Sequence, residues 1–220
     1  MPRLEWDKSG EKFFHTGVDQ VVLYRHTQSK QYGKGVAWNG VTGITESPSG
    51  AEATKLWADN IKYGELRSAE EFGATIEAYQ SPKEFDECDG SKEIATGIYA
   101  GQQNREPFGL SYRTLIGNDV SGTEAGYEIH LVYGAMASPS EQSHSTVNDS
   151  PEAETLSWTV ETTPINSGIQ NLKPIAHIKI NSTELESEAL TAIENALYGT
   201  QNAEAYLPLP SDLLTLISNG

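Results

Sequence analysis

Residues 127–164 read YEIHLVYGAMASPSEQSHSTVNDSPEAETLSWTVETTP, and this stretch contains two strand-like segments joined by a long polar link. In the first segment, YEIHLVY, and in the last, TLSWTVET, residues alternate between two faces, as in a strand with one buried face. The link has turn-forming Ser, Pro, Asn and Asp residues and no Lys or Arg. The stretch therefore predicts two strands of an antiparallel sheet beside a polar connection.

The same period of two recurs elsewhere in the chain. It is clear in FGATIEAY (72–79), PFGLSYRTLIG (107–117) and AHIKI (176–180), and it is weaker in VVLYRH (21–26). Each of these segments offers one face to a core and one to water, which is typical of antiparallel sheets. The chain is therefore predicted to be rich in antiparallel strands.

One segment, residues 182–198, has the spacing of an amphipathic helix instead. Leu185, Ala189 and Ile193 fall on one side of it, acidic residues occupy its first turn, and Gly199 follows its end. The predicted fold class is mainly β (α+β): an antiparallel β-sandwich or barrel flanked by one α-helix, with a long loop and extended terminal arms.

The chain is predicted to form a single domain over residues 1–220, because no linker or internal repeat divides it. Residues 1–20 are expected to form an N-terminal arm. Residues 199–220 are apolar but interrupted by Pro, so we expect a C-terminal arm that docks in an extended form.

Residues 31–60 lack a long alternating run and are predicted to form a long loop or a protruding hairpin. This segment is rich in Gly and contains Trp38 and Trp57. Exposed aromatic side chains on such a loop would suit burial against another chain. The alternative is that both tryptophans cover the core of their own domain.

The net charge of −16 is distributed unevenly. Residues 114–220 carry 14 acidic side chains and two basic ones, whereas residues 1–113 carry 17 acidic and 13 basic ones. A surface that binds nucleic acid neutralises phosphates with cations, so this chain is a poor candidate for one. The N-terminus has no apolar signal-peptide region, no apolar run has the length of a membrane span, and a single cysteine fits a reducing compartment.

Catalytic motifs and phosphate-binding loops are missing from the sequence. Its histidines lack the spacing of a metal site, Cys88 has no basic neighbour to stabilise a thiolate, and FDECDGS at 85–91 does not match a calcium loop. We therefore predict no catalytic residue, no metal and no cofactor. The acidic composition leaves open a carboxylate pair that hydrolyses glycosides.

Several segments resemble, in order along the chain, the major tail protein, or tail tube protein, of long-tailed (siphovirus-type) bacteriophages. They are WDKSGEKFFHTGVDQVVLY, AWNGVTGITESPSGAEATKLWADNIKY, FGATIEAYQSPKEFDECDG, QNREPFGLSYRT and the stretch at 127–164. The resemblance covers nearly the whole chain and weakens after about Leu197. Some members of that family carry an additional C-terminal immunoglobulin-like domain, and no such domain is expected here.

The resemblance implies a structural protein rather than an enzyme. Members of that family form hexameric rings that stack head to tail into the tube through which DNA is ejected. It implies contacts with a tape measure protein inside the tube, with the tail terminator and with distal tail or baseplate proteins, while viral DNA passes without specific binding. The expected location is the virion, and the host cytoplasm during assembly, with no membrane partner.

Two groups of side chains are predicted to serve this function. Candidates for contacts between rings or subunits are Phe13, Phe14, Trp38, Trp57, Glu141, Asp149, Glu152 and Glu154. Candidates that face the lumen are Thr75, Glu77, Glu128, Ser157, Thr159 and Glu161. The alternative functions are a carbohydrate-binding or carbohydrate-hydrolysing β-sandwich, and a related tube protein of a contractile or secretion system.

Overall fold

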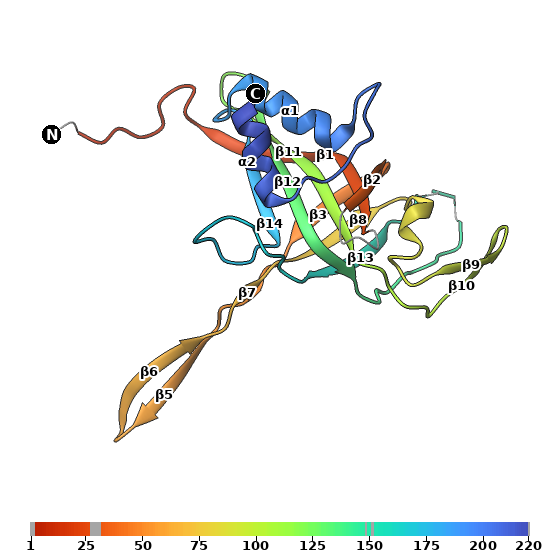
Figure 1. The fold of residues 1–220 in the computed structure, drawn as a ribbon, viewed down its shortest axis with the longest axis horizontal. Helices are drawn as coiled ribbons and strands as arrows, with labels where there is room; N and C mark the ends of the chain where they lie inside the picture. Colours follow the sequence, from red (N-terminus) through yellow and green to blue (C-terminus); the bar gives the residue numbers. More distant parts are fainter. Residues whose placement is uncertain (1–2, 27–31, 148, 151, 220) are drawn as a thin grey trace.

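The computed structural model describes residues 3–26, 32–147, 149–150 and 152–219 (Figure 1). The ends of both predicted arms, Gln31 of the predicted loop, and Asn148 and Pro151 of the polar link lie outside the described residues.

An antiparallel sheet of eight strands forms the body of the protein. Seven strands follow the order β2-β1-β11-β12-β13-β8-β3, and β14 also pairs with β12. Their bounds are β1 Phe13–His26, β2 Tyr32–Ala37, β3 Val41–Glu46, β8 Gly73–Ala78, β11 Phe108–Asn118, β12 Gly122–Ala137, β13 Leu156–Thr162 and β14 His177–Asn181. This architecture confirms the expected fold class, a mainly β protein of antiparallel strands with a helical flank.

Strand β12 bends at Gly134 and therefore takes part in two layers of the body, one with β1 and β11 and the other with β13 and β8. Residues 128–132 pair with β14, whereas residues 135–137 pair with β13. Gly134 has a φ of 60°, and a Cβ atom there would lie 2.1 Å from the carbonyl oxygen of Thr163. Only glycine fits this position. Beyond the bend, β13 and β8 face β1 and β11 across a shared core.

Aromatic side chains fill the core between the two layers. The ring of Trp38 lies 4.5 Å from that of Phe85 and 5.4 Å from that of Trp158, measured between centroids. Trp38 is only 3% exposed, and its Nε1 donates a hydrogen bond to the Gln80 carbonyl oxygen. The prediction that Trp38 contacts another subunit is therefore wrong, because this side chain belongs to the core of its own domain.

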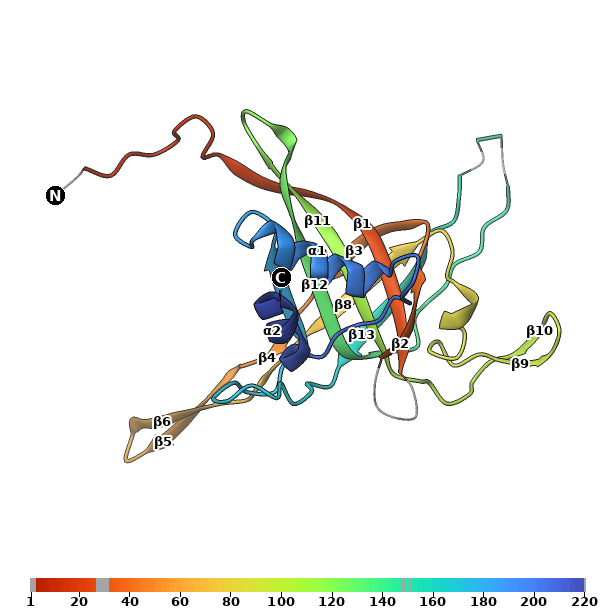
Figure 2. The ribbon, with the colours of Figure 1, turned by 45° about the horizontal axis from the view of Figure 1, so that its top comes forward.

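A second core lies on the other face of β12, under the helices α1 (Ser187–Tyr198) and α2 (Pro210–Asn219). Figure 2 shows α1 lying across β11 and β12. The predicted alternation along β12 is confirmed, since Ile129, Leu131 and Tyr133 all face the helices. The opposite face of β12 is not left to water, however, because His130 and Val132 are also buried.

The predicted helix needs correction at its start, and the prediction of an extended C-terminal arm is wrong from Pro210 onward. Helix α1 begins at Ser187 rather than residue 182, because Asn181 Oδ1 accepts a hydrogen bond from the Thr183 N–H in a preceding turn. The C-terminal segment has neither helix nor strand from Gly199 to Leu209. It then forms α2, because Pro210 suits the first position of a helix and Leu213 and Leu216 pack into the second core.

The remaining strands form projections from the body. Figure 1 shows the hairpin of β5 (Ala53–Ala58) and β6 (Ile61–Arg67) extending far from the sheet. Its stem is the short pair β4 (Ser49–Gly50) and β7 (Glu70–Glu71), and a second projection carries β9 (Lys92–Ala95) and β10 (Ile98–Ala100) after the 3-10 turn η1 (Lys83–Phe85).

The projections correct two predicted boundaries. The long loop was placed at residues 31–60, but β2 and β3 belong to the main sheet and the projecting segment spans residues 47–72. The N-terminal arm was placed at residues 1–20, but β1 begins at Phe13. In both segments, regular strands occur where the sequence lacks a simple alternation, because glycines and bulges interrupt the pattern.

Candidate functional sites

The β5–β6 hairpin exposes apolar side chains that have no core of their own. Trp57 is 67% exposed and Tyr63 is 76% exposed, and Leu56, Ile61 and Leu66 are also exposed. Asp59 and Asn60 have positive φ angles, which suits the tight turn at the tip. An isolated two-stranded hairpin is marginally stable in water, and clustered apolar side chains on a surface mark interaction sites. The predicted contact residue Trp57 therefore lies on a candidate binding surface.

The N-terminal segment exposes a second set of apolar side chains. Leu4, Trp6 and Phe13 are largely exposed, and Phe14 is partly so. The Phe14 ring occupies the space over Gly117, where a Cβ atom would lie 2.4 Å from its Cζ. Phe13 is thus free to contact another molecule, whereas Phe14 already packs in part on its own subunit.

The acidic link contributes exposed carboxylates. Glu141, Asp149 and Glu152 are exposed, as a contact with another molecule would require. Glu154 differs, because its carboxylate accepts hydrogen bonds within the link from the Ser145 N–H and lies 3.0 Å from His144 Nδ1. These interactions, the Ser145 N–H foremost, hold the pKa of Glu154 below its ordinary value.

Five of the six predicted lumen residues share one face of β13 and β8. The register pairs Ser157 with Glu77 and Thr159 with Thr75, while Trp158 and Ile76 point into the core. Together with Glu161 they form a polar outer face opposite the first core. Glu128 is separate from this group, because it lies on β12 in the other layer.

In the described part of the chain, the sheet has open edges at β14 and along the first part of β1, besides those of its end strands β2 and β3. Strand β14 pairs with β12 on one side only. The first part of β1 extends beyond β2, which pairs with residues 22–26. Edges of this kind present unpaired N–H and C=O groups and favour pairing with a strand of another chain.

A polar groove of about 520 Å³ lies on the sheet face that points away from α1. Side chains from five strands line it, including His15, Glu46, Thr114, Glu128, His130 and Lys179. The groove therefore brings together polar groups from β1, β3, β11, β12 and β14.

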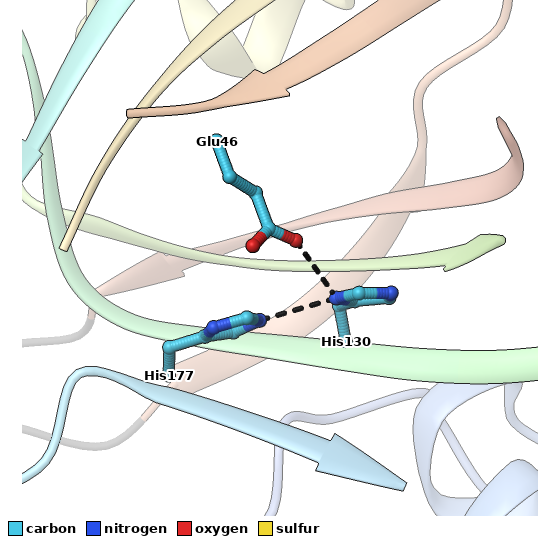
Figure 3. A group of neighbouring side chains, drawn as sticks. All are labelled: Glu46, His130 and His177. Carbon is cyan, nitrogen blue, oxygen red and sulfur yellow. Dashed lines mark hydrogen bonds and ion pairs between the residues drawn. The ribbon is translucent and has the colours of Figure 1, made fainter. Parts of the chain in front are cut away.

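Beside this groove, Glu46, His130 and His177 converge from β3, β12 and β14 (Figure 3). His130 Nδ1 lies 3.1 Å from Glu46 Oε1 and 3.2 Å from His177 Nε2. The Tyr112 hydroxyl donates a 2.8 Å hydrogen bond to Glu46 Oε1, and Thr114 Oγ1 lies 3.0 Å from His130 Nε2. Glu46, His130 and His177 form the candidate ligand cluster of the protein.

The environment sets the charge of this cluster. Burial lowers the pKa of both His130 and His177 to about 4, so both imidazoles are neutral near pH 7. Burial acts to raise the pKa of Glu46, but the hydrogen bond from Tyr112 and the nearby Lys179 ammonium hold it below its ordinary value. One carboxylate and two neutral imidazoles are the protonation states in which these groups bind metals.

The sequence interpretation missed this cluster because its members are far apart in the chain. The register pairs His130 with Lys179 and Val132 with His177, so the two histidines are diagonal neighbours on one sheet face. The sequence analysis found no metal-ligand spacing among the histidines and did not predict that this pair lies side by side. The alternation in YEIHLVY and AHIKI placed each histidine opposite the apolar face, which was the available signal.

Comparison with protein-family models and with curated proteins finds no match for this chain. In the part of the chain that the structure describes, no helix is long and apolar enough to cross a membrane.

Proposed function

We propose that this chain is a self-assembling structural protein, the tail tube protein of a long-tailed bacteriophage, and not an enzyme. The observation that carries the proposal is the projecting β5–β6 hairpin, whose exposed Trp57, Ile61 and Tyr63 belong to neither hydrophobic core of the described residues. A subunit that keeps such a hairpin gains stability when another copy covers it.

The open sheet edges support ring formation. Strand β14 and the first part of β1 lie on opposite sides of the β11–β12 pair. Pairing of β14 in one copy with β1 in the next joins two different surfaces, and such a contact closes into a ring when the rotation between copies allows it. In the proposed tube, six copies form each ring.

The charge distribution supports a conduit for DNA. The polar face of β13 and β8 carries Glu77 and Glu161 and no cation, and the chain as a whole is strongly acidic. An acidic lumen lets DNA slide without binding. On this proposal the other partners are a tape measure protein, the tail terminator and distal tail or baseplate proteins, and the location is the virion after assembly in the host cytoplasm.

Electron microscopy and sedimentation of the purified chain over a range of concentrations test the proposal. We expect rings and tubes of constant diameter. A matched variant replaces residues 54–66 by Asn-Gly, which joins the register partners Ala53 and Arg67 through a two-residue hairpin turn. This variant should fold and stay unassembled. A full-length chain that is monomeric at every concentration, or a shortened variant that assembles normally, would overturn the proposal.

A further inference from the structure

We propose that Glu46, His130 and His177 form a binding site for one divalent transition-metal ion of the zinc class. The inference is independent of the proposed function, since it rests on the geometry of these side chains alone. Their potential ligand atoms, a carboxylate oxygen and two imidazole nitrogens, lie within 4.8 Å of one another.

Two of the three separations match the edges of a metal coordination tetrahedron. Ligands bound to Zn²⁺ at about 2.0–2.1 Å in tetrahedral geometry lie about 3.3 Å from one another. The separation between His130 Nδ1 and Glu46 Oε1 is 3.1 Å, and that between His130 Nδ1 and His177 Nε2 is 3.2 Å. Two of the three edges are therefore close to those of a metal site before an ion binds.

Hydrogen bonding alone satisfies this cluster poorly. His130 Nδ1 faces both the Glu46 carboxylate and His177 Nε2, yet a neutral imidazole carries one N–H and has one acceptor nitrogen. If His130 Nδ1 carries the proton, this single N–H faces two acceptors, Glu46 Oε1 and His177 Nε2. If His177 Nε2 carries a proton and His130 Nδ1 does not, the two acceptors His130 Nδ1 and Glu46 Oε1 face each other. A metal ion accepts a lone pair from all three atoms.

The surrounding side chains hold the ligands in place. Thr114 Oγ1 can accept a hydrogen bond from the His130 Nε2–H, which leaves the Nδ1 lone pair free for a metal. The Tyr112 ring stacks on His130 at 4.4 Å, and the Phe72 ring lies 4.2 Å from His177. The Tyr112 hydroxyl also orients the Glu46 carboxylate. Metal sites depend on outer partners of this kind.

The donor set selects the class of ion. Two imidazoles and one carboxylate suit Zn²⁺, Co²⁺, Ni²⁺ or Cu²⁺, whereas Mg²⁺ and Ca²⁺ prefer oxygen ligands. The three ligands leave a fourth position for water. Lys179 Nζ lies 3.7 Å from Glu46 Oε2 and competes with the ion for this carboxylate. Because Glu46 is the last residue of β3, the ion would tie the base of the projecting segment, residues 47–72, to β12 and β14.

Titration of the untagged full-length chain with Zn²⁺, followed by calorimetry, tests the site. We expect one ion per chain, and Co²⁺ should produce the visible absorption of a tetrahedral complex with nitrogen and oxygen ligands. The variant His177→Gln should abolish both signals. The control His144→Gln removes an exposed histidine that also lies beside a glutamate, and it should leave both unchanged.

A second variant separates loss of binding from loss of fold. Tyr112→Phe retains the stacked ring but removes the hydrogen bond to Glu46, and removal of such an outer partner should weaken Zn²⁺ binding by about 10- to 100-fold. Circular dichroism of each variant checks that the sheet is intact. Absence of Zn²⁺ and Co²⁺ binding by the wild-type chain, or equal binding by folded His177→Gln, would overturn the inference.

Discussion

Replacing Trp57 and Tyr63 by serine should block assembly without unfolding the subunit. The two side chains are 67% and 76% exposed, so the isolated subunit gains little from them. Full burial of a large apolar side chain contributes about 1.5–3 kcal/mol. Multiplied by the exposed fractions, this gives about 2–4 kcal/mol for the two side chains together in a contact that covers both. Loss of this contribution raises the critical concentration for assembly by roughly 30- to 1,000-fold.

The measurement is the soluble fraction after high-speed sedimentation over a concentration series. Urea unfolding of the dilute subunit should give a free energy within about 0.5 kcal/mol of the wild-type value, as is usual for surface substitutions. Leu172→Ser is the matched control, because Leu172 is 49% exposed and belongs to the connection between β13 and β14 rather than to the hairpin. An unchanged critical concentration in the double variant, or an equal rise in the control, would contradict the role of the hairpin.

Three further predictions concern other parts of the molecule. Burial raises the pKa of the Cys88 thiol to about 12, so alkylation by iodoacetamide at pH 8 should be at least about 100-fold slower in the folded chain than in urea, and similar rates would show that the thiol is accessible. Gly134→Ala should reduce the free energy of unfolding in urea by at least about 2 kcal/mol, because the added Cβ clashes with Thr163. The control Gly122→Ala, also at a φ of 60° but without a neighbour within 4 Å, should reduce it by only about 1 kcal/mol. Light scattering should show slower polymerisation at high salt, with formed tubes intact, if exposed charges such as Lys8 and Glu141 steer assembly, and salt-induced dissolution of formed tubes would contradict this.

The strands that could be predicted from the sequence are those that bury one face. Trp158 and Val160 in β13, and Ile76 and Ala78 in β8, are all buried at the alternating positions that indicated them. The β5–β6 hairpin gave no such signal, because neither of its faces packs on the body. Alternation of apolar and polar residues predicts a strand only where one face of that strand is buried within the same chain.

The convergence of Glu46, His130 and His177 could not be predicted for a different reason. Alternation indicates which face a side chain occupies, but it does not indicate which strands are neighbours or in which register they pair. The bend at Gly134 and the pairing of β12 with β14 decide both. The buried position of Trp38 likewise depends on Phe85 and Trp158, which come from distant segments.

The body and the hairpin should respond differently to substitution, because the body has buried cores whereas the hairpin side chains are exposed. The first core, with Trp38 and Trp158, and the second, with Ile129 and Ile193, are closed within one chain, so truncation there destabilises the subunit itself. The hairpin has exposed apolar side chains, so truncation there should leave the subunit's own stability nearly unchanged and, on the proposed function, weaken the association of copies. Glu46 is the last residue of β3 before the projecting segment, so the cluster of Glu46, His130 and His177 lies where this segment leaves the body. An ion bound there would therefore stiffen the attachment of the hairpin more than it stabilises the body. Removal of the ion should change assembly more than it changes the free energy of unfolding of the core.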